Sequence, residues 1–90
     1  MKWFVYILLC DEKAYYVGLT SDIEQRLKSH HAGYNLGTKE FSKVQLLYTE
    51  QYQKRIDAEK REKQIKGWGR KKKEALIMHD LESLKKLSKS

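Results

Sequence analysis

The chain opens with an unbroken apolar run, Trp3–Cys10, that is rich in aromatic and β-branched residues. A run without polar alternation is typical of a strand covered on both faces, and therefore of a central strand. Residues 11–13 are polar and predict a turn, and residues 14–19 predict the returning strand. The pattern therefore predicts a hairpin at the start of the fold.

A first helix is predicted after this hairpin. Ser21 and Glu24 have the spacing of a capping box, which indicates that a helix begins near residue 22. We expect it to continue to about residue 32, because Gly33 is well placed to end it.

The remaining chain contains one more short apolar segment and two stretches with helical periodicity. The expected elements are a loop over residues 34–43, a strand over 44–48, a helix over 54–66 and a helix over about 70–87. The order ββαβαα predicts an α+β fold in which helices cover a small mixed or antiparallel sheet.

Length and composition narrow the class of protein. The 90 residues have room for one hydrophobic core, so we expect a single domain over 1–90. The longest apolar run has eight residues, whereas a membrane helix needs roughly 20. Polar residues follow that run directly, which disfavours a secretory leader. We expect a cytoplasmic protein in which Cys10, the one cysteine, is a buried packing residue.

The charge is distributed very unevenly along the chain. The net charge is +7, yet residues 1–50 carry six basic and six acidic side chains, and the whole excess lies in residues 51–90. Ten basic residues fall between positions 54 and 73. Such a concentration favours a polyanionic partner, although a solvated helix face gives the same pattern.

The hairpin brings candidate chemistry together. If three residues form the turn, Tyr6 pairs with Gly18 and Leu8 pairs with Tyr16, so two phenols share one face beside a missing side chain. Glycine inside a strand often marks the close approach of a ligand or of the backbone. Ordinary cross-strand packing is the alternative interpretation.

The first predicted helix carries Arg26 and His30 four residues apart, and therefore on one face. A guanidinium contacts two phosphate oxygens at once and stabilises developing charge, and an imidazole moves a proton. The pair suits a phosphate ligand, with two solvated side chains as the alternative.

The second predicted helix places Glu62 on the face of Ala58 and Ile65, which points toward the sheet. An inward carboxylate is explained either by a salt bridge to Lys66, four residues on, or by a metal ion. Magnesium needs only one or two protein carboxylates, because waters and substrate phosphate complete its octahedron.

These features together resemble the GIY-YIG nuclease superfamily, and more narrowly its small single-domain, UPF0213-like bacterial branch. The resemblance covers residues 3 to about 78. It rests on five features in the correct order: Phe4-Val5-Tyr6, Tyr16-Val17-Gly18, Arg26, His30 and Glu62 in Arg61-Glu62-Lys63-Gln64-Ile65-Lys66-Gly67-Trp68. It implies a three-stranded antiparallel sheet flanked by helices, and cleavage of nucleic-acid phosphodiesters with one divalent metal ion, Mg²⁺ or Mn²⁺.

The resemblance also implies roles for individual residues. Tyr6 would bind or deprotonate the attacking water, Tyr16 would position the water or the scissile phosphate, and Gly18 would leave space. Arg26 would stabilise charge on the phosphate, and His30 would assist proton transfer or hold the phosphate. Glu62 would be the metal ligand. Two departures from the family pattern are Phe4 and Val5 in the first motif and the lack of an asparagine after Glu62.

Two functions of different class follow. The first is a metal-dependent endonuclease, acting on DNA with low sequence specificity or with a protein partner that supplies target choice. The second is a nucleic-acid-binding module without catalysis, and a scaffold for an acidic protein partner is a weaker third. In the first two, the contacts to nucleic acid come from Lys54, Arg55, Lys63, Lys66, Arg70, Lys71, Lys72 and Lys73.

Overall fold

The computed structural model describes the backbone of residues 1–31 and 43–89 and the side chains of 1–28 and 43–86. In chain order the elements are β1 (Trp3–Cys10), β2 (Ala14–Thr20), α1 (Ile23–His31), β3 (Val44–Tyr52), α2 (Arg55–Lys66), α3 (Arg70–Ile77) and α4 (Leu81–Lys89). No helix among these residues is long and apolar enough to span a membrane.

The sheet has three antiparallel strands in the order β2-β1-β3, so the apolar run is the central strand, as predicted. The hairpin turn has three residues, of which Asp11 and Glu12 adopt positive φ angles of 50° and 59°. The amide of Lys13 closes the turn by donating to the carbonyl of Cys10 at 3.0 Å. This turn length fixes the β1–β2 register.

A β-bulge in the β1–β3 pairing decides which residues of β3 face which helix. Leu8 pairs with Leu46 but Ile7 pairs with Tyr48, so one residue of β3 is extra at this point. Because side chains alternate along a strand, the extra residue changes the face on which all later side chains lie. Leu46 therefore packs on the α1 side of the sheet, and Tyr48 packs on the α2 side.

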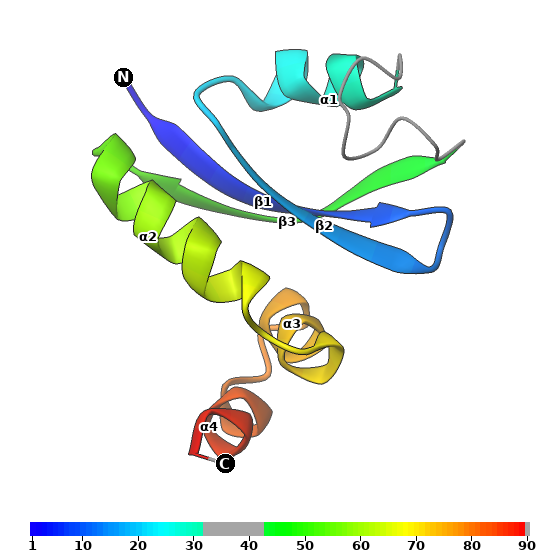
Figure 1. Cartoon of the computed structure of the whole chain (residues 1–90), viewed down its shortest axis with the longest axis vertical. Helices are drawn as coiled ribbons and strands as arrows, with labels where there is room; N and C mark the ends of the chain where they lie inside the picture. Colours follow the sequence, from blue (N-terminus) through cyan, green and yellow to red (C-terminus); the bar gives the residue numbers. More distant parts are fainter. Residues whose placement is uncertain (32–42, 90) are drawn as a thin grey trace.

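Helices cover both faces of the sheet, with α1 on one side and α2 on the other (Figure 1). The α1 side contains the buried residues Tyr6, Leu8 and Cys10. Cys10 is fully buried, as predicted, and burial raises the pKa of its thiol. The opposite side contains the buried residues Val5, Ile7, Val17, Ala58, Ile65 and Leu76.

Two element ends differ from the prediction. Helix α1 is capped by Asp22, whose Oδ1 accepts the amide of Gln25 at 3.1 Å, and not by the predicted box of Ser21 and Glu24. The predicted helix end at Gly33 and most of the predicted loop, 34–42, lie outside the described residues. Strand β3 continues to Tyr52, beyond the predicted 44–48, because its second half pairs with the first half of β1.

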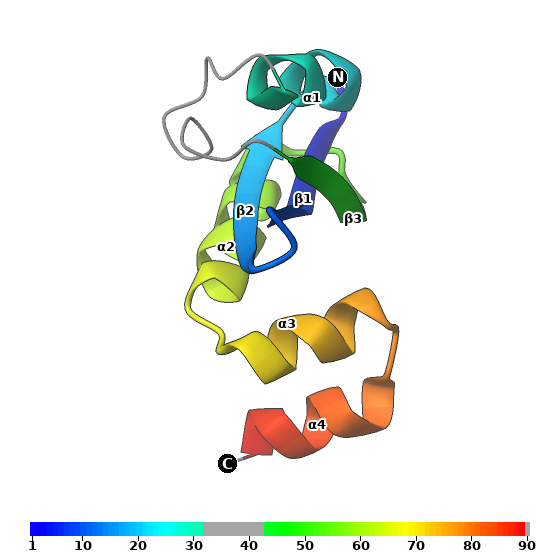
Figure 2. The same ribbon diagram turned by 90° about the vertical axis from the view of Figure 1, so that its right-hand side faces the viewer.

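The helix predicted over about 70–87 is wrong, because the chain breaks it into α3 and α4. At the break, His79 has a φ of 57°, a left-handed conformation that ends a helix. Asp80 then caps α4: its Oδ1 accepts the amide of Ser83 at 3.1 Å, and its Oδ2 accepts the Ser83 hydroxyl at 2.7 Å. The two helices form an antiparallel pair, with α4 on the side of α3 away from the sheet (Figure 2). The order is therefore ββαβααα.

Candidate active site

The centre of the candidate site is the contact between Tyr6 and Gly18, which are paired across β1 and β2 as predicted. The Tyr6 ring lies directly over Gly18: a Cβ atom at Gly18 would lie 2.3 Å from both Cζ and Oη of Tyr6. Because Gly18 has no side chain, the Tyr6 phenol has room to extend over β2 toward the edge of the sheet. Tyr6 is only 2% exposed.

Tyr16 is the second phenol at this place. It pairs with Leu8, and its ring centroid lies 6.4 Å from that of Tyr6 with the planes tilted by 38°. Both rings are on the α1 face, as the hairpin register predicted. Tyr16 is half-buried, so it lies closer to solvent than Tyr6 does.

Helix α1 brings Arg26 to the same place. Arg26 lines a small pocket with Tyr6 and Leu27, and it also lines a hollow of about 200 Å³ beside Asp22 and Gln25. His30 lies one turn further along α1, and its side chain is outside the described part of the structure.

Helix α2 contributes Glu62 from the other side of the sheet. Ala58 and Ile65 on the same helix are fully buried, and the Glu62 side chain is 22% exposed, so this carboxylate is partly inward as predicted. Its Oε1 lies 3.4 Å from Nζ of Lys66, the predicted helical partner. Glu62 also lies within electrostatic range of the Tyr6 hydroxyl.

The charges around Tyr6 show that four of the predicted residues share one environment. Burial raises the pKa of Tyr6 well above its ordinary value, and the neighbouring Tyr16 and Glu62 raise it further. Arg26 acts in the opposite direction because a cation favours the phenolate. Tyr6 is therefore a neutral phenol at neutral pH, within electrostatic range of a guanidinium and a carboxylate.

A family model described as the GIY-YIG catalytic domain matches residues 2–75 of the chain. The chain belongs to the GIY-YIG family. Within it, a UPF0213 protein of Natronomonas pharaonis is 36% identical over 75 residues, covering 82% of this chain and 88% of that protein. A UPF0213 protein of Staphylococcus saprophyticus is 39% identical over 77 residues, covering 84% and 94%.

Solved structures agree with this placement. The NMR structure of a UPF0213 protein from Bacillus halodurans superposes with a TM-score of 0.58 at 32% identity, over 87% of this chain and 84% of that one. The NMR structure of an E. faecalis protein gives a TM-score of 0.62 at 31% identity, over 88% and 85%. The resemblance predicted from the residues, to the small UPF0213 branch of the GIY-YIG family, is confirmed.

Glu62 is the carboxylate at this site that could bind the divalent metal ion expected of a GIY-YIG protein. Within residues 1–31 and 43–89, no three His, Cys, Asp or Glu side chains form a group that could hold an ion. Glu62 is partly desolvated and within electrostatic range of Tyr6, and its ion pair among the described residues is a 3.4 Å contact to Lys66, which is itself 54% exposed. A single carboxylate with open surroundings fits a hydrated magnesium ion, which keeps several waters.

The predicted nucleic-acid contacts divide into two groups. Lys54, Lys63 and Lys71 are exposed, and Lys73 is half-buried. The other four make contacts within the chain: Arg55 with Glu59 and Trp3, Lys66 with Glu62, Arg70 with Glu74 and Tyr15, and Lys72 with Trp68.

A half-buried polar network next to the site was not predicted from the sequence. The Arg61 guanidinium donates to both oxygens of Glu50, at 2.9 and 3.0 Å, and the hydroxyls of Tyr48 and Tyr52 each donate to Glu50 at 2.6 Å. The Arg61 guanidinium also lies 5.0 Å from the Trp68 ring centroid. The one local sign of this network in the sequence is the i, i+2 spacing of Tyr48, Glu50 and Tyr52, which places them on one face of β3. The β-bulge decides which face that is.

This network holds α2 against β3. Arg61 and Glu62 are adjacent and lie on opposite flanks of the buried Ala58–Ile65 stripe, so Arg61 reaches β3 while Glu62 lies on the other flank, within electrostatic range of Tyr6. Burial raises the pKa of Glu50, but hydrogen bonds from Arg61, Tyr48 and Tyr52 outweigh it and hold that pKa below its usual range. The network therefore fixes the rotation of the helix that carries Glu62.

Proposed function

We propose that this protein is a metal-dependent endonuclease that hydrolyses phosphodiester bonds of DNA with low sequence specificity. The observation that carries the proposal is the convergence of Tyr6, Tyr16, Arg26 and Glu62 beside the Gly18 gap in a member of the GIY-YIG family. Phenols, a guanidinium and a carboxylate are the groups that orient water, neutralise phosphate charge and hold a divalent ion.

Glu62 would hold the ion, either Mg²⁺ or Mn²⁺. When bound, such an ion supplies Lewis acidity at a phosphate oxygen and lowers the pKa of water. The partial burial of Glu62 supports this role, because a partly desolvated carboxylate gains more from a divalent cation than from the exposed lysine that it now contacts.

The two tyrosines would hold the attacking water. Because Tyr6 is protonated at neutral pH, its hydroxyl is a hydrogen-bond donor until a cation lowers its pKa, and Arg26 already acts in that direction. Tyr16, closer to solvent, would orient the water or the scissile phosphate. The water oxygen then bonds to phosphorus, its proton passes to a base at the site, and the bond from phosphorus to the leaving oxygen breaks.

Arg26 would stabilise the negative charge that develops on the phosphate in this step, since a guanidinium contacts two oxygens at once. The hollow of about 200 Å³ beside Arg26 gives a phosphate access to it. His30, on the next turn of α1, would protonate the leaving oxygen or hold the phosphate.

Lys54, Lys63, Lys66, Lys71 and Lys73, with Arg55, Arg70 and Lys72, would contact the backbone of the nucleic acid. Phosphate contacts position a protein on its substrate and carry no sequence information, which supports low specificity. A protein partner would then supply target choice.

A second candidate is a nucleic-acid-binding module without cleavage. The Glu62–Lys66 ion pair favours it, because a lysine in contact with the carboxylate competes with a metal ion. In this alternative the basic residues bind phosphates and the Tyr6 environment is structural.

Cleavage of labelled DNA separates the two. The purified protein is incubated with single-stranded, duplex and branched DNA in the presence of Mg²⁺, Mn²⁺ or EDTA. An endonuclease produces fragments with either metal and none with EDTA. Salt-sensitive binding without fragments under any condition would establish the binding module instead.

A further inference from the structure

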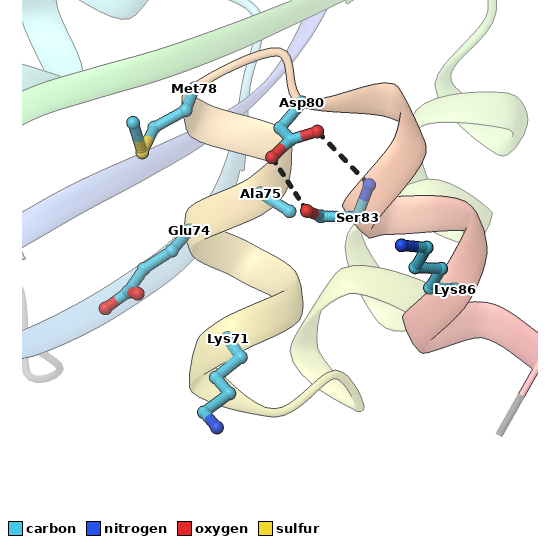
Figure 3. Close-up of a pocket in the computed structure, with 7 residues that line it drawn as sticks. All are labelled: Lys71, Glu74, Ala75, Met78, Asp80, Ser83 and Lys86. Carbon is cyan, nitrogen blue, oxygen red and sulfur yellow. Dashed lines mark hydrogen bonds between the residues drawn. The ribbon is translucent and has the colours of Figure 1, made fainter.

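The break between α3 and α4 brings two basic segments together that the sequence keeps apart. In one continuous helix, Lys71 and Lys86 would be separated by about 22 Å along the axis, at 1.5 Å per residue. In the antiparallel pair, both lysines line the same hollow of about 360 Å³ (Figure 3). Both side chains are exposed; Lys71 lies on α3 at the end of the hollow away from the Met78–Asp80 turn, and Lys86 lies on α4 beyond Ser83 (Figure 3).

The carboxylates that line this hollow are already engaged. Glu74 pairs with Arg70 at 3.1 Å, and Asp80 is used by the cap to Ser83, although Lys86 lies within its electrostatic range. None of the ion pairs among the described residues involves Lys71 or Lys86. The hollow therefore has one such ammonium group on each of its two helices, and the two point in different directions (Figure 3).

Helix α3 begins at the same sheet edge as the candidate active site. The Arg70 guanidinium lies 4.6 Å from the Tyr15 ring centroid on β2 and donates to the carbonyl of Lys13. At the other end of α3, the His79 ring lies 5.8 Å from Tyr48 on β3. The start of α3 thus lies at the hairpin end of β2, the strand that also carries Tyr16 and Gly18.

We propose that Lys71 and Lys86 form a second backbone-binding site, which contacts phosphates of the nucleic acid at a distance from the scissile bond. The inference rests on the proposed function, because it takes nucleic acid as the ligand. It adds Lys86 of α4 to the binding residues and places the second site between α3 and α4. Ala75 and Met78 give the hollow an apolar wall that suits the sugars between phosphates. A substrate must be long enough to span both sites to gain from the second.

The test measures DNA binding by the full chain, using fluorescence anisotropy over a range of salt concentrations. The variants are Lys71→Ala, Lys86→Ala and the double variant. Lys2→Ala is the matched control, because Lys2 is exposed and lies near the N-terminus, at the far end of the molecule from α4. Duplexes of two lengths are compared, one covering the active site alone and one much longer.

On the long duplex, each single variant should lower the slope of log K against log salt by about 1, and the double variant by about 2. On the short duplex, Lys86→Ala should bind like the wild type. An unchanged slope in the double variant, an equal loss on both lengths, or a wild type that binds no DNA would overturn the proposal. Binding without any cleavage would refute the endonuclease and leave this second site standing.

Discussion

The phenol of Tyr6 occupies the space that a side chain at Gly18 would fill, at 2.3 Å from the position of its Cβ atom. The glycine is required by this space rather than by its backbone, because Gly18 lies in the regular ladder of β2. The β1–β2 pair thus leaves space for the Tyr6 ring, and the Tyr6 hydroxyl lies within electrostatic range of Arg26 and Glu62.

Gly18→Ala should displace the Tyr6 ring and strongly lower activity while the protein still folds. The added methyl overpacks a well-filled face, which costs about 1–3 kcal/mol of unfolding free energy. A displacement of about 1 Å at a reacting group lowers the cleavage rate by about 100-fold. Thermal unfolding and the cleavage assay measure the two effects.

The control for this change is Gly67→Ala at the end of α2. Gly67 has a φ of −78°, and a Cβ atom there would meet its nearest neighbour, the carbonyl of Gln64, at an ordinary 3.5 Å. Its stability and rate should match those of the wild type. A Gly18→Ala protein as active as this control would show that the Tyr6 position does not matter for the chemistry.

Glu50→Gln should destabilise the fold through the network with Arg61. The Glu50 side chain is 15% exposed and that of Arg61 is 23% exposed, so removing one charge leaves the other partly buried. We expect a loss of about 3 kcal/mol in the free energy of unfolding, measured by urea denaturation. Glu59→Gln is the matched control, because its ion pair with Arg55 is solvent-exposed and contributes little.

The same carboxylate should make stability depend on pH. The folded pKa of Glu50 lies below its unfolded value of roughly 4.3, so its contribution is present above that value and is lost as pH falls through the folded pKa. The wild type should lose melting temperature on acidification below about pH 5 more steeply than Glu50→Gln does. Parallel curves for the two proteins would show that the network is not the source of acid sensitivity.

Asp80→Ala should loosen α4 without affecting the sheet. The variant removes both hydrogen bonds to Ser83, which leaves the first turn of α4 without its cap. Hydrogen exchange should become faster in α4 and stay unchanged in β1. Unchanged protection across α4 would mean that its packing on α3 holds the helix without the cap.

The hairpin could be predicted from sequence because its information is local. A three-residue turn fixes the register, and the register alone places Tyr6 opposite Gly18 and Leu8 opposite Tyr16. The inward position of Glu62 was also predictable, because helical spacing links it to Ala58 and Ile65 within one element.

What could not be predicted depends on contacts between elements. Ile77, Leu81 and Leu84 keep helical spacing across the break, so periodicity predicts one helix where His79 and Asp80 form a turn. The polar Glu50 gave no sign of a half-buried strand position, since its partner Arg61 is eleven residues away on α2. Charge pattern likewise could not show that Lys71 and Lys86 share a hollow.

Glu62 is the residue on which metal-dependent cleavage should depend most directly. We would measure DNA cleavage and DNA binding by Glu62→Gln beside Glu59→Gln, the same change made on the exposed side of the same helix. The proposed mechanism predicts that Glu62→Gln cuts no DNA with Mg²⁺ or Mn²⁺ yet binds it as tightly as the wild type, while Glu59→Gln cuts normally. Cleavage by Glu62→Gln at the wild-type rate would contradict the assignment of the metal to this carboxylate.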